Sequence, residues 1–68
     1  MINGNISKMI RKLRTALGLT QEQFAAKIGV TYSTINRWEN NKSKPSPLAM
    51  QKIKKIQKEL RRKKNNLK

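Results

Sequence analysis

The sequence TQEQFAAKIGVTYSTINRWEN, residues 20–40, carries the signals of two short helices joined by a tight turn. Thr20 and Gln23 form a capping-box pattern, in which the Thr20 hydroxyl accepts the Gln23 N–H and the Gln23 side chain reaches back. Gly29 supplies the positive φ that turns the chain after the first helix. Thr31 is a suitable N-cap for the second helix. This pattern predicts a helix-turn-helix.

Apolar and small residues in this stretch recur on one side of each predicted helix. Ala25 is small where the two helices must cross, and the second helix should end near Asn40–Asn41, because Asn tolerates the left-handed conformation. The predicted buried residues are Phe24, Ala25, Ile28, Val30, Ile35 and Trp38.

A helix is also expected before the motif, where apolar residues recur at spacings of three and four. We expect Asn5 or Ser7 to cap its start and Gly18 to end it. Its apolar stripe consists of Ile6, Met9, Ile10, Leu13, Ala16 and Leu17.

A fourth helix should follow the loop that ends at Pro45, with Ser46 as its cap and Pro47 in the first helical position. Its apolar stripe is Ala49, Ile53, Ile56 and Leu60. This spacing fits two interpretations, since the stripe can cover the core of its own domain or form the seam of a dimer. Residues 61–68 are interpreted as a basic tail, either a frayed helix end or a disordered segment.

The composition reduces the range of possible functions. The 68 residues hold 17 Lys and Arg against 3 Asp and Glu, a net charge of +14, with no Cys and no His. The three acids Glu22, Glu39 and Glu59 are far apart in sequence, so we expect no enzyme, no metal site and no cofactor. No apolar run is long enough to cross a membrane, which favours a cytoplasmic protein. The positive charge requires a polyanion as partner.

The segment TQEQFAAKIGVTYSTINRWENNKSKPS, residues 20–46, resembles the phage-repressor-like (Cro/C1-type, XRE) helix-turn-helix family, and the resemblance extends over residues 6–60. It implies an all-α fold. Residues 1–60 would form a small four-helix, lambda-repressor-like DNA-binding domain with an extended last helix, and residues 61–68 would form the basic tail. Asn41 stands where the family commonly has Gly, and the family's dimer surface cannot be transferred to this chain.

The resemblance implies sequence-specific binding of double-stranded DNA by a transcriptional regulator, repressor or antitoxin-like, with residues 31–40 in the major groove. The expected base-reading residues are Tyr32, Ser33, Asn36 and Arg37, and the expected phosphate contacts are Gln21, Asn40, Lys42 and Lys44. Arg can bond to guanine O6 and N7, and Asn to adenine N6 and N7. Arg14 is expected to pair with Glu39 as a structural salt bridge. The tail should act only as diffuse charge near phosphate.

Alternative functions stay open at this point. An antitoxin-like module would have a toxin or another protein as its main partner, and an exposed apolar patch on the fourth helix would mark it. A basic helix over residues 47–64 could instead lie on an anionic membrane surface. RNA binding is disfavoured because the chain has one Phe, one Tyr and one Trp. The leading interpretation has double-stranded DNA as partner, a homodimer on DNA and no membrane.

Overall fold

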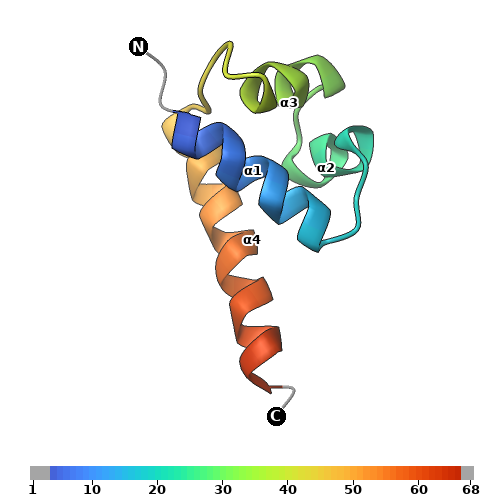
Figure 1. Cartoon of the computed structure of the whole chain (residues 1–68), viewed down its shortest axis with the longest axis vertical. Coiled ribbons are helices and arrows are strands. Elements are labelled where there is room, and N and C mark those ends of the chain that lie inside the picture. The colour runs from blue at the N-terminus through green and yellow to red at the C-terminus, as the bar shows by residue number, and fades with distance from the viewer. Residues whose placement is uncertain (1–3, 67–68) are drawn as a thin grey trace.

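The computed structural model describes residues 4–66, and it describes side chains for residues 5–62. Four helices make up this part of the chain: α1 (Gly4–Ala16), α2 (Gln21–Ile28), α3 (Tyr32–Glu39) and α4 (Pro47–Asn66). In Figure 1, α2 and α3 lie on one side of α1 and α4 lies on the other. The last turns of α4 extend beyond the other three helices (Figure 1), and the molecule measures 39 × 23 × 19 Å along its principal axes.

The caps and turns predicted within residues 20–41 are present in the structure. Thr20 Oγ1 accepts from Gln23 N at 3.1 Å, and Gln23 Oε1 accepts from Thr20 N at 2.9 Å, which completes the capping box. Gly29 has φ 91° after α2, and Asn41 has φ 60° after α3. Thr31 Oγ1 accepts from Thr34 N at 3.2 Å and caps α3. The helix-turn-helix is therefore built from its caps and left-handed residues.

One predicted boundary was wrong. The helix α1 begins at Gly4, so Asn5 and Ser7 lie within it and do not cap it. Short polar residues are tolerated in the first turn at a cost of a few tenths of a kcal/mol, so they do not fix a helix start. Of the two alternatives for residues 61–68, the structure favours the helical one, because α4 continues to Asn66. Lys and Arg are good helix formers, which lets the helix run on; Leu67 and Lys68 lie outside the described residues.

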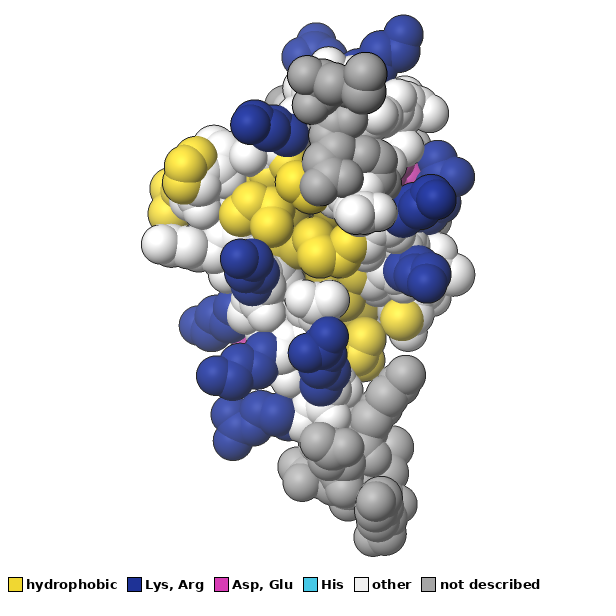
Figure 2. All heavy atoms as spheres, turned by 60° about the vertical axis from the view of Figure 1, so that its left-hand side comes forward, with side chains coloured by type: hydrophobic (Ala, Val, Ile, Leu, Met, Phe, Trp, Pro, Cys, Tyr) yellow, Lys and Arg dark blue, Asp and Glu magenta, His cyan; other side chains and the backbone are white. Residues whose placement is uncertain are grey.

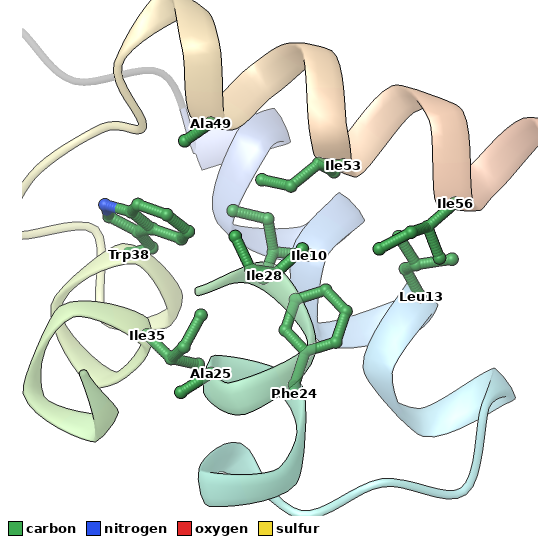
Figure 3. Packing of buried hydrophobic residues seen from close by; sticks show 10 residues of the cluster. All are labelled: Ile10, Leu13, Phe24, Ala25, Ile28, Ile35, Trp38, Ala49, Ile53 and Ile56. Carbon is green, nitrogen blue, oxygen red and sulfur yellow. The ribbon is translucent and has the colours of Figure 1, made fainter. Parts of the chain in front are cut away.

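The core draws on all four helices. Ile10, Phe24, Ile35 and Ile53, one from each helix, are each 0% exposed. Figure 3 shows the whole cluster, which consists of Ile10, Leu13, Phe24, Ala25, Ile28, Ile35, Trp38, Ala49, Ile53 and Ile56. Burying side chains of this size stabilises a fold by about 1.5–3 kcal/mol each.

This core decides between the two interpretations of the α4 stripe. Ala49, Ile53 and Ile56 are at most 9% exposed within a single chain, and Leu60 packs partly buried against them. The dimer-seam interpretation was therefore wrong, because the same side chains already cover the domain's own core. The burial of these side chains leaves Leu48, which is 65% exposed, as the large apolar side chain of α4 available to a membrane surface.

Candidate nucleic-acid interface

One side of α3 is fixed against the core, which determines what its other side presents. Ile35, Trp38 and Glu39 are all buried, and Figure 3 shows Ile35 and Trp38 directed toward the core. The helical pitch therefore turns the opposite side outward. Tyr32 is 48% exposed, and Ser33 and Arg37 are exposed as well. A rigid helix thus presents a polar face that carries one cation.

Asn36 differs from the other predicted base-reading residues. Its side chain is half-buried, and its Oδ1 accepts a hydrogen bond from Asn40 Nδ2. Reading adenine needs both the oxygen and the amide nitrogen of an Asn. The Asn36 oxygen keeps a second lone pair and its amide nitrogen keeps two hydrogens, so the contact with Asn40 positions Asn36 without preventing that pair.

The Glu39 carboxylate joins three helices, although it belongs to α3. Its Oε2 accepts from Arg14 Nε at 2.6 Å, and its Oε1 accepts from Arg14 Nη2 at 3.1 Å, so the expected pair with α1 is present as a two-pronged salt bridge. Oε1 also accepts from Gln21 Nε2 of α2 at 3.1 Å. The Glu39 side chain is 1% exposed and that of Arg14 is 20% exposed. This network fixes the angle of α3 relative to α1 and α2.

The environment of Glu39 changes the ionisation of both partners. Burial by itself would raise the pKa of Glu39, but hydrogen bonds from Arg14 and Gln21, with the charges of Arg14 and Arg11, hold that pKa below its ordinary value. The hydrogen bond to Glu39 raises the pKa of Arg14. Both groups therefore stay charged at neutral pH, as a two-pronged bond requires.

Two contacts in this region were missed in the sequence. Arg11 Nη2 donates to the backbone oxygen of Glu39 at 3.3 Å, and its Nε lies 3.7 Å from Glu39 Oε1. Its position three residues before Arg14, on the same helix face, was the available signal. Lys52 Nζ of α4 donates to the Ile28 backbone oxygen at 3.3 Å, at the end of α2. Cations are favourable at helix C-termini, but no sequence spacing indicates that partner.

The predicted phosphate contacts lie on α2 and in the segment that follows α3. Gln21 is half-buried in the first turn of α2, where the positive end of the helix dipole favours anions. Asn40, Lys42 and Lys44 are exposed in and after the turn that ends α3, and Lys42 N donates to Arg37 O at 2.8 Å. Gln21 is thus linked to α3 through its bond to Glu39, and the side chains of Lys42 and Lys44 are exposed to solvent.

A family model described as helix-turn-helix matches residues 10–56, which is more than half of the chain and spans all four helices. The chain belongs to the Cro/C1-type helix-turn-helix family. Members of this family are DNA-binding regulators, and the all-α arrangement of four helices is consistent with the lambda-repressor-like fold. No curated protein and no solved structure is significantly similar to the chain.

The surface charge agrees with DNA as the partner class of this family. Figure 2 shows one face of the molecule, on which Lys and Arg side chains are numerous and acidic side chains are almost absent. No helix within residues 4–66 is long and apolar enough to cross a membrane. For a Cro/C1-type domain, the net charge of +14 creates a positive potential that raises the rate of encounter with DNA.

Proposed function

We propose that this protein is a sequence-specific regulator of transcription that places α3 in the major groove of double-stranded DNA. The observation that carries the proposal is the two-sided character of α3: Ile35, Trp38 and Glu39 anchor it, while Arg37 and Ser33 face outward. Base reading requires a rigid helix, because hydrogen bonds to base edges tolerate little displacement.

Arg37 is proposed as the main base-reading residue. It is exposed, and it directly precedes Trp38, which is 5% exposed. An Arg in this setting can bond to O6 and N7 of one guanine, which discriminates by about 1–3 kcal/mol against another base. Ser33 can bond to a base as donor or acceptor, and Tyr32 can contact a thymine methyl group or a phosphate. Asn36 can pair with adenine N6 and N7 while its oxygen still accepts from Asn40.

Gln21, Asn40, Lys42 and Lys44 are proposed to bind the phosphates on either side of α3. Gln21 combines two tasks, because an amide nitrogen carries two hydrogens and only one is needed for Glu39. The Glu39 network thus supports the proposal by linking a phosphate contact on α2 to the angle of α3. Phosphate contacts set the register of a protein on DNA, and base contacts set its sequence preference.

Repressor and antitoxin-like regulator are the two subtypes that we propose within this function, with a homodimer formed on DNA. Each subunit would bind one half-site, and the two half-sites would lie about one helical turn apart. The stripe on α4 is not available for that dimer, since it is buried in the core. The gene neighbourhood separates the subtypes, because an antitoxin is encoded beside its toxin.

Selection of bound duplexes from a random pool tests the proposal. We expect the full chain to select a converged motif with guanine at one strongly preferred position in each half-site. The matched variant is Arg37→Lys, which keeps the charge but loses the two-pronged geometry, and it should relax that position alone. A pool that stays random after repeated selection would contradict sequence reading.

A further inference from the structure

The outer face of α4 carries a row of cations that the proposed function does not use. Four exposed basic side chains make up this row, which we name the α4 basic strip: Lys54, Lys55, Lys58 and Arg62. At 3.6 residues per turn, all four lie on the side of the helix opposite Ala49, Ile53 and Ile56. Arg61 does not belong to the strip, because it is turned toward α1, where it lines a hollow with Lys8 and Lys12. Glu59 lies at the edge of the strip and is the only acid in the described part of α4.

The α4 basic strip faces away from the outer side of α3. Figure 3 shows Trp38 of α3 close to Ala49 of α4, with the core between the two helices, and Figure 1 shows α4 running away from α3 beyond that point. Arg62 follows Ala49 by thirteen residues, which is about 20 Å of helix. The short axes of the molecule are 23 and 19 Å, whereas charges in physiological salt are screened over about 8 Å. The strip and the outer side of α3 thus lie on different sides of the core.

This arrangement conflicts with the expectation that residues 61–68 serve as diffuse charge for the duplex that α3 reads. Arg62 lies on the strip, and Arg61 lies beside Lys8 and Lys12 of α1. The side chains of residues 63–68 lie outside the described part of the chain.

We propose that the α4 basic strip is a second, sequence-independent binding surface for double-stranded DNA, so that one molecule can hold two duplexes together. From Lys54 to Arg62 the strip spans about 12 Å, and that length of duplex carries about seven phosphate charges. Four exposed cations in one row suit a phosphate backbone. Bridging rests on the proposed function for the duplex at α3, while binding at the strip does not.

Other partners fit the strip less well. A membrane-surface helix needs a continuous exposed apolar face, whereas Ala49, Ile53 and Ile56 of α4 are buried and Leu48 is the large apolar side chain of α4 that is mostly exposed. Single-stranded RNA needs aromatic side chains for stacking, and the strip has none. A second copy of the chain would oppose cation to cation.

A duplex-capture assay tests the inference. The selected duplex is fixed to beads and saturated with the full chain, excess protein is washed away, and a labelled duplex of scrambled sequence is added at 0.15 M salt. The strip variant is Lys58→Gln/Arg62→Gln, and the matched control is Lys8→Gln/Lys12→Gln on α1. Both variants remove two exposed cations four residues apart. Affinity for the selected duplex is measured separately at limiting protein.

The strip variant should lower capture about tenfold and flatten the plot of log K for the second duplex against log salt by about 1.8, since each phosphate contact contributes about 0.9. Its affinity for the selected duplex should stay within about twofold of that of the unmodified chain. Unchanged capture would overturn the inference, as would an equal loss in the α1 control. Arg37→Ala provides the second arm, measured with the protein itself fixed to the beads. It should weaken the selected duplex and leave capture of the scrambled duplex unchanged, and a loss of both would mean that two α3 helices of a dimer form the bridge.

Discussion

Replacement of Glu39 by Ala should destabilise the fold by about 2–3 kcal/mol. The carboxylate accepts two hydrogen bonds from Arg14 and one from Gln21, and its side chain is 1% exposed. Breaking a fully buried charge pair costs about 3–5 kcal/mol, and losing a hydrogen bond to a charged group costs about 1.5–3 kcal/mol. Arg14 is 20% exposed and can recover part of its hydration, so the expected cost stays below the range for a fully buried pair and in the upper part of the range for a hydrogen bond to a charged group.

Urea unfolding followed by circular dichroism measures this cost, and a thermal scan should show a fall in Tm of about 8–20 °C. A double-mutant cycle with Arg14→Met isolates the pair, and we expect a coupling energy of about 1–2 kcal/mol. Arg11→Met is the matched control. Its side chain is 59% exposed and its Nε lies 3.7 Å from Oε1, so it should cost less than about 1 kcal/mol. A coupling energy of zero, or equal costs for the two Arg variants, would refute the assignment of Arg14 and Glu39 as the stabilising pair.

Two further predictions concern stability. The pKa of Glu39 is lower in the folded chain than in the unfolded chain, so its contribution is complete above pH of about 4.3 and is lost as the pH falls through the lower folded-state value. Unfolding of the unmodified chain should therefore become easier below that pH, and Glu39→Ala should show a flatter profile over the same range; parallel profiles would contradict this. Gly29→Ala should cost about 1–2 kcal/mol in urea unfolding, because φ is 91° there, while the added Cβ would lie an ordinary 3.7 Å from Lys52 Nζ. A neutral substitution would show that this turn relaxes without strain.

Signals that involve residues close together in the chain led to correct predictions. The capping box at Thr20, the cap at Thr31 and the left-handed residues Gly29 and Asn41 each involve neighbours in the chain, so short spacings suffice to predict them. The inner face of α3 followed from the helical period, with Ile35 and Trp38 buried. The pairing of Arg14 with Glu39, by contrast, came from the family resemblance.

The features that could not be predicted from the sequence depend on which helices pack against each other. An apolar stripe with a spacing of four and three suits a core and a dimer equally, and only the packing of α4 on α1 and α2 buried Ala49 and Ile53 in the core. The contact of Lys52 with Ile28 O joins residues that are 24 positions apart. The number of cations on α4 can be counted in the sequence, but their position across the core from α3 cannot be predicted from it.

The proposed function depends most on a bond from Arg37 to a guanine in the major groove. A protein–DNA double-mutant cycle tests this bond most directly. The preferred guanine of the selected duplex is replaced by an analogue that carries carbon in place of N7, and both duplexes are titrated with the unmodified chain and with Arg37→Ala. If Arg37 bonds to N7, the analogue should weaken binding of the unmodified chain by about 1 kcal/mol and leave binding of Arg37→Ala unchanged. An equal loss for both proteins would contradict it, because the N7 contact would then belong to another residue.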